Sequence, residues 1–261
     1  MFTQELKKVF SSKSYLSVFL VMLVVSLCNN AELLYSAHLA QYGTQNFHPV
    51  FASLLTGFDY IRWDLIIIYA LPAFIIFAYS GKYATEKSFH IENLYLLRSS
   101  RSKTFYTRIG VAFISAFVLF ASVCLLNLFG NMVVNPGGDD FMGAENMALD
   151  AVGYDFYFAV HSPYLNYFLF ILTGSFAAAL LAVLCQSVSY IICDNRISIL
   201  VCIVIWLCYF QDYPLFVGGA FEPFGEDGFR GILTSISAFL PVVVISLVIA
   251  ICVKRRRQDE L

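Results

Sequence analysis

The residues able to do chemistry in this chain are its histidines, cysteines and carboxylates, and their spacing excludes the common catalytic sites. The sequence contains no G-x-x-x-x-G-K-[ST] loop for nucleotide phosphates, no H-E-x-x-H and no G-x-S-x-G. The four histidines have no paired metal-ligand spacing, and the seven cysteines lie in or beside apolar runs. The cysteines match no zinc pattern, so they read as small buried hydrophobes. The sequence therefore predicts no enzymatic activity, no metal and no cofactor in this chain.

One long segment, Ser80 to Arg108, is both basic and interrupted by apolar residues at helical spacing. Ile91, Leu94 and Tyr95 fall at i, i+3 and i+4, which places them on one face of a helix. Such a short amphipathic helix can dock sideways into a groove on a soluble partner. Its cations can equally bind phospholipid headgroups. Spacing alone leaves both interpretations open.

Composition indicates that lipid, and not only water, surrounds the apolar runs on either side of residues 80–108. Apolar residues make up 59% of the 261 residues and charged residues only 13%, whereas a soluble domain carries about 25% charge. No basic domain or recognition motif supports binding to nucleic acid.

Apolar runs predict an all-α polytopic membrane protein, with residues 1–261 forming a single transmembrane domain. Residues 1–14 carry an apolar stripe beside three lysines and are expected to form a helix lying in the membrane interface. Pro72 within the second apolar run removes one backbone hydrogen bond and is expected to kink that helix. Six transmembrane helices are expected, at about 15–34, 62–80, 109–134, 164–192, 197–210 and 231–253.

The distribution of charge predicts the orientation of these spans. With both termini in the cytosol, 14 of the 16 lysines and arginines lie inside, and only Arg62 and Arg230 lie outside. Twelve of the 18 acidic residues then lie outside. The positive-inside rule strongly favours this arrangement over its inverse. The expected location is the plasma membrane of a bacterium, where the lipid itself is a partner.

A family resemblance rests on the basic segment and on the order of the spans. Glu86 is followed by Leu94-Tyr95-Leu96-Leu97 and then by Ser99-Ser100-Arg101-Ser102-Lys103. With an amphipathic N-terminus and six spans, this pattern resembles the permease subunits of type 2 ABC transporters. The chain departs from the family where Phe89 to Glu92 replace its usual glycine-threonine, and the acidic loop between the third and fourth spans is longer than usual.

The resemblance implies a cytosolic coupling helix between the second and third spans, in contact with a soluble ABC ATPase. The residues it implies for this contact are Glu86, Lys87, His90, Ile91, Leu94, Tyr95 and Arg98. It implies a second cytosolic contact at Asp194, Asn195 and Arg196, and a re-entrant segment matching Tyr213 to Phe221. Two copies of the ATPase, which would hold ATP and magnesium, and a second permease subunit, identical or related, are the expected partners.

The expected outer surface is acidic. The connection between the third and fourth spans has no lysine or arginine and carries the rim residues Asp139, Asp140, Glu145, Asp150 and Asp155. Such a rim suits export or clearance of cationic, amphipathic peptides, as in bacteriocin export or immunity, and it is equally compatible with a merely solvated surface. The alternatives are a membrane sensor or assembly subunit that does not transport, and a membrane-embedded enzyme. The enzyme needs ionisable side chains at membrane depth, which the spans lack.

Overall fold

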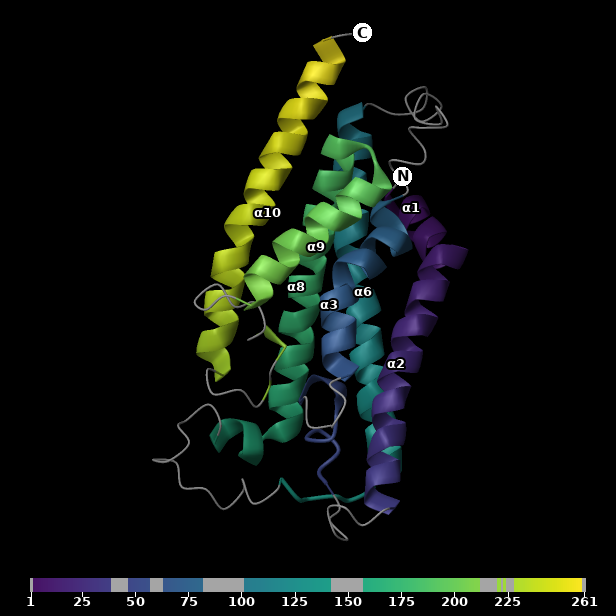
Figure 1. Ribbon diagram of the computed structural model, residues 1–261, viewed down its shortest axis with the longest axis vertical. Coiled ribbons are helices and arrows are strands. Elements are labelled where there is room, and N and C mark those ends of the chain that lie inside the picture. Colours follow the sequence, from purple (N-terminus) through teal and green to yellow (C-terminus); the bar gives the residue numbers. More distant parts are fainter. Residues whose placement is uncertain are drawn as a thin grey trace.

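The computed structural model describes residues 2–38, 47–56, 63–81, 101–141, 157–211, 220–221, 223 and 228–259. Over these residues the fold is a bundle of long helices (Figure 1) with no named strand. The elements are α1 (Phe2–Phe10), α2 (Lys13–His38), the 3-10 turn η1 (Leu54–Thr56), α3 (Trp63–Ile75), the π-helical turn η2 (Ile76–Ser80), α6 (Arg101–Val134), α8 (Pro163–Ile192), α9 (Asn195–Gln211) and α10 (Gly228–Asp259).

Five helical segments are long and apolar enough to cross a membrane. They are Lys13–Glu32, Trp63–Ser80, Lys103–Val134, Pro163–Ile192 and Phe229–Arg256. The apolar part of α9, Asn195–Tyr209, is shorter. The predicted all-α polytopic class is therefore confirmed in the described part of the chain, with five candidate spans.

Helix α8 lies at the centre of the bundle and packs against α6, α9 and α10. Its small residues make this possible: Gly174 receives the rings of Phe120 and Phe221, and a Cβ at this glycine would lie 3.2 Å from both. Ala178 on the same face is fully buried. The small residues of this span thus permit a close approach of the neighbouring side chains.

The second span contains two departures from α-helical hydrogen bonding. Pro72 has no N–H, so the carbonyl of Ile68 loses its partner four residues on. The indole Nε1 of Trp206 in α9 donates to this carbonyl at 2.8 Å. Trp206 is fully buried, and its ring meets Phe239 edge-on at 5.7 Å. The unpaired carbonyl that Pro72 creates is therefore satisfied by a neighbouring helix.

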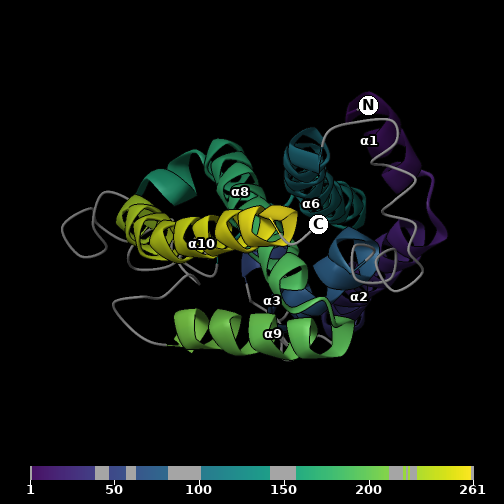
Figure 2. The same ribbon diagram turned by 90° about the horizontal axis from the view of Figure 1, so that it is seen from above.

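The remainder of the second span widens into a π-helical turn. Residues Ile76–Ser80 form the π-helical turn η2, and the N–H of Gly81 donates to the carbonyl of Ile76 at 2.9 Å. π-helical turns are rare and occur frequently at functional sites. Helix α9, which carries Trp206, runs obliquely beside this span (Figures 1 and 2).

Candidate functional site

The two ends of the bundle carry opposite charge. One end, here called the basic end, holds α1, the first turns of α2 and α6, and the last turns of α10 (Figure 1). Its described cations include Lys7, Lys8, Lys13, Lys103, Arg108, Arg196, Lys254, Arg255 and Arg256. The other end, the acidic end, holds Glu32, Asp64, Asp139 and Asp140, together with the exposed Arg230 in the first turn of α10. The separation predicted from the order of charges thus has a counterpart in the folded chain.

The predicted coupling-helix residues Glu86, Lys87, His90, Ile91, Leu94, Tyr95 and Arg98 lie outside the described residues. Both flanks of this segment are described. It follows Gly81, at the end of η2, and it precedes Arg101, where α6 begins. Its two ends therefore start from the second and third apolar helices.

The connection between α8 and α9 is a compact turn at the basic end. Cys193 adopts a left-handed conformation with φ of 58°, and its N–H donates to the carbonyl of Ser189 at 3.0 Å, which ends α8. Asp194 then caps α9: its Oδ1 accepts from the N–H groups of Arg196 at 2.8 Å and Ile197 at 3.2 Å. Of the predicted contact residues Asp194, Asn195 and Arg196, the last two thus belong to the helix and not to the turn.

This turn lies against the point from which residues 82–100 depart. A Cβ built on Gly81 would lie 3.2 Å from Oδ1 of Asn195 and 2.9 Å from the carbonyl of Ile76. Only a residue without a side chain fits so close an approach. Asn195, one of the residues of the second predicted cytosolic contact, therefore lies beside Gly81, the residue that directly precedes residues 82–100.

Helix α10 contacts the beginning of α6 at the basic end. The Nζ of Lys254 lies 5.3 Å from the ring centre of Phe105 and 5.2 Å from that of Tyr106, within the range of cation–π attraction. Phe105 also meets Tyr190 of α8 edge-on at 5.0 Å. The helix that follows residues 82–100 is therefore in direct contact with α8 and α10.

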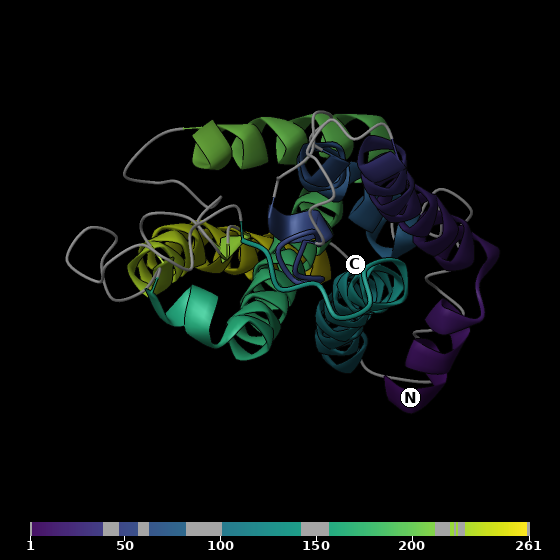
Figure 3. The ribbon, with the colours of Figure 1, turned by 90° about the horizontal axis from the view of Figure 1, so that it is seen from below.

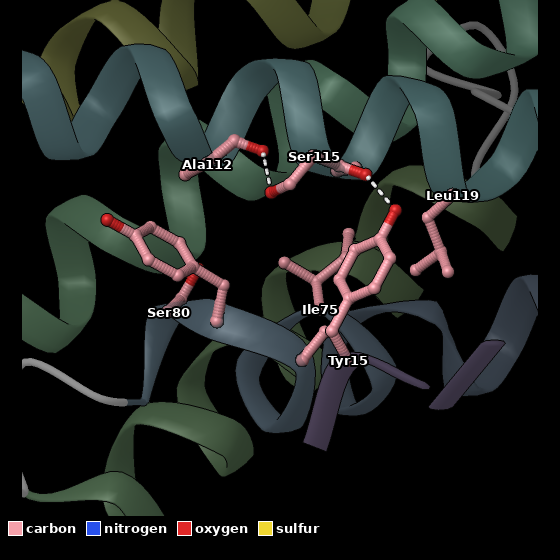
Figure 4. A pocket seen from close by; sticks show the side chains of 9 residues that line it. Tyr15, Ile75, Ser80, Ala112, Ser115 and Leu119 are labelled. Atoms are coloured by element: carbon pink, nitrogen blue, oxygen red, sulfur yellow. Dashed lines mark hydrogen bonds between the residues drawn. The ribbon is translucent and has the colours of Figure 1, made fainter. Parts of the chain in front are cut away.

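A small pocket lies beside η2 (Figure 4), between α2, the second span and α6, with a volume of about 10 Å³. The hydroxyl of Tyr15 donates to the carbonyl of Ser115 across it at 3.1 Å. The buried Oγ of Ser80 also lines it and has no hydrogen-bond partner among the described residues. Such a volume has room for about one water molecule.

The acidic end contains a feature that the sequence did not predict. Residues 47–56, here called the outer cap, fall between the expected spans at 15–34 and 62–80, and therefore in a connecting loop. Val50, Ala52, Leu54 and Leu55 in this segment are instead at most 1% exposed. The outer cap therefore lies within the bundle and not on its surface.

Side-chain amides from two helices hold the outer cap. The Oδ1 of Asn127 accepts from the N–H of Leu54 at 2.8 Å, and its Nδ2 donates to Asn30 Oδ1 at 2.8 Å and to the carbonyl of Ser26 at 2.9 Å. Asn131 donates to the carbonyl of Ala52 at 3.1 Å and to Asn127 Oδ1 at 3.2 Å. Buried backbone without regular structure needs such partners. The pair Asn127 and Asn131, one helical turn apart in an apolar span, was the available sequence signal.

Of the predicted acidic rim, Asp139 is exposed and Asp140 is half-buried, whereas Glu145, Asp150 and Asp155 lie outside the described residues. Asp140 is tied to the outer cap by an isolated bridge to Phe47. Its carbonyl accepts from the N–H of His48 at 3.0 Å. Among the described residues, no three histidine, cysteine or carboxylate side chains gather as metal ligands.

Five helices of the described chain are long and apolar enough to cross a membrane. The fold is therefore that of a helical, multi-pass membrane protein. No protein-family model, no curated protein and no solved structure matches it.

Proposed function

We propose that this chain is the membrane-spanning subunit of an ATP-driven transporter of the type 2 ABC class. It crosses the membrane six times with both termini in the cytosol, and a separate ATPase drives it from the basic end. The sequence resemblance, which is specific over Glu86 to Arg108, suggests the class. The observation that carries the proposal is the contact of Gly81 with Asn195, because it sets the start of residues 82–100 beside the α8–α9 turn.

The six-span topology requires α9 to cross as the fifth span. Its 17 residues correspond to roughly 26 Å at 1.5 Å per residue, the lower limit for a spanning helix. The opposite charge of the two ends supports this arrangement, because it places the basic end in the cytosol.

The spans supply no group that could drive transport by themselves. Their carboxylates lie near the acidic end, where Glu32 Oε2 accepts from Trp63 Nε1 at 2.6 Å and Asp64 begins α3. A proton-driven carrier uses ionisable groups at membrane depth. An external source of energy, such as ATP bound with magnesium on a partner, fits such a membrane domain better.

The proposed substrate is a cationic, amphipathic peptide that is exported or cleared from the membrane. The acidic end, with Asp139 exposed, offers a surface of complementary charge. A second permease subunit, identical or related, completes the pathway.

Co-expression with a candidate ABC ATPase tests the proposal. We expect the two proteins to co-purify, and we expect the paired substitutions Glu86→Ala and Leu94→Ala to reduce coupled ATPase activity at least tenfold, as loss of about 1.4 kcal/mol of contact energy would do. The matched control is Glu5→Ala with Leu16→Ala, which removes an acid and an exposed leucine elsewhere. Failure to co-purify, or an equal loss in the control, contradicts the proposal.

A further inference from the structure

The outer cap closes the acidic end of the bundle. Seen end-on, it lies across the interior between the helices (Figure 3). Its η1 turn (Leu54–Thr56) packs on α3 and α6, and Leu54 and Leu55 join the main core. Whatever passes between the helices at this end has to displace these residues.

The outer cap contains little regular structure, apart from the 3-10 turn η1 and the isolated bridge between Phe47 and Asp140. Asn127 holds the N–H of Leu54, and Asn131 holds the carbonyl of Ala52, which also accepts from Asn29 at 3.4 Å. Local opening costs least where a segment contributes little regular structure. The cap can therefore leave its position without unfolding α2 or α6.

His48 stands at the entrance of the cap and fixes its first turn. Its Nδ1 accepts from the N–H of Val50 at 3.2 Å. The ring stacks on Phe141 at 4.7 Å and lies 5.0 Å from the ring of Tyr164. Because Nδ1 is the acceptor, the neutral ring carries its proton on Nε2. A proton added at Nδ1 removes the acceptor that Val50 uses.

We propose that the outer cap is a pH-released closure, opened when His48 takes up a proton from the solvent at Nδ1. The described groups that face His48 are Asp139, which favours the imidazolium, the ring of Tyr164, and Asp140 through its backbone carbonyl. The aromatic rings of Phe141 and Tyr164 bury the imidazole.

The net effect on His48 favours the closed cap at neutral pH. Burial lowers the pKa of His48 from its ordinary 6.5, and the charge of Asp139 opposes this only in part. A histidine whose pKa is lowered in the closed state stabilises that state above about pH 6.5 and loses this contribution as the pH falls. Acid on this side of the membrane therefore opens the cap.

Thiol labelling of the purified chain in lipid nanodiscs tests this without ATPase or nucleotide. Ser53→Cys places a near-isosteric thiol in the buried cap, and Pro136→Cys gives an exposed reference. Labelling of the chain without an introduced cysteine is subtracted. We expect the labelling rate at position 53, divided by that at position 136, to rise several-fold as the pH falls from about 7.5 to about 5.5. The largest possible rise is about tenfold for each unit by which the pKa of His48 differs between the open and the closed cap.

The matched variant is His48→Asn. An asparagine Oδ1 can accept from the N–H two residues on, as His48 Nδ1 does here, but it does not titrate. We expect low labelling at both pH values in this variant. An unchanged ratio with His48 present, or the same rise with asparagine, overturns the proposal.

Amide exchange gives a second readout that needs no cysteine. The N–H of Leu54 is protected by Asn127, and its protection factor, corrected for intrinsic exchange, is expected to fall with the pH only when His48 is present. Constant protection contradicts the proposal. Because neither measurement involves a partner protein, their failure and the failure of ATPase coupling are separate results.

Discussion

Replacement of Asn127 by leucine is expected to lower the free energy of unfolding by about 2–4 kcal/mol, since each buried group left unsatisfied costs about 1–3 kcal/mol. Leucine has the same number and branching of side-chain heavy atoms and is bulkier, so the site stays filled and little packing is lost. Four hydrogen bonds are lost instead, including those to the N–H of Leu54 and the carbonyl of Ser26. The Nδ2 of Asn131 would also lose Asn127 Oδ1 as an acceptor. The Oδ1 of Asn131 has no hydrogen-bond partner among the described residues in the native chain either.

Reversible unfolding of the detergent-solubilised chain measures this loss. The matched control is Ser122→Ala, on the same helix, whose exposed hydroxyl bonds only the carbonyl of Val118. We expect the control to change stability by less than about 0.5 kcal/mol, as exposed substitutions usually do. If both variants lost the same stability, the amides would not be what holds the outer cap.

Replacement of Trp206 by phenylalanine is expected to cost about 1–3 kcal/mol, because the carbonyl of Ile68 is then buried without a donor. The aromatic contacts with Phe239 and Phe221 can persist in part. The loss should therefore come mainly from the single hydrogen bond of 2.8 Å between Trp206 and Ile68.

A double-mutant cycle isolates this bond. Pro72→Ala restores an N–H that can donate to Ile68 within the helix, so Trp206→Phe should cost less than half as much in that background. The interaction energy that such a cycle measures between contacting residues is about 0.5–3 kcal/mol. Equal costs in the two backgrounds would show that Trp206 acts only through packing.

The bond between Trp206 and Ile68 also bears on how the proposed transporter moves. The second span carries Pro72, then the π-helical turn, then Gly81 against Asn195. It thus touches α9 at two places, Ile68 and Gly81, which lie roughly 20 Å apart at 1.5 Å per residue. On the proposed function, a push on residues 82–100 reaches α3 and α9 together.

The helical elements could be predicted because apolar runs of spanning length determine them directly. The run expected at 164–192 is α8, Pro163–Ile192, and that expected at 109–134 is the apolar part of α6. Ends set by hydrogen bonds were harder to place. Asp194 reads as part of a turn, whereas its side chain caps α9 and starts the helix at Asn195.

The outer cap could not be predicted, because its partners are distant in sequence. Leu54 and Asn127 are 73 residues apart, and Trp206 and Ile68 are 138 apart. Pro72 indicated that a donor was needed but not which one. Residues 47–56 have no helical or strand periodicity; six of the ten are apolar, which is compatible with burial but does not indicate the element that covers them. The coupling residues Glu86 to Arg98 remain a prediction from the sequence.

The most direct test of the account asks which side of the membrane the basic end faces. Lys87→Cys and Pro136→Cys, each in otherwise identical chains, are labelled with a charged, impermeant thiol reagent in intact cells and in inverted vesicles. The account predicts that position 87 reacts only in inverted vesicles and position 136 in intact cells. Labelling of position 87 in intact cells would contradict the cytosolic placement of residues 82–100, and with it the proposed contact with an ATPase.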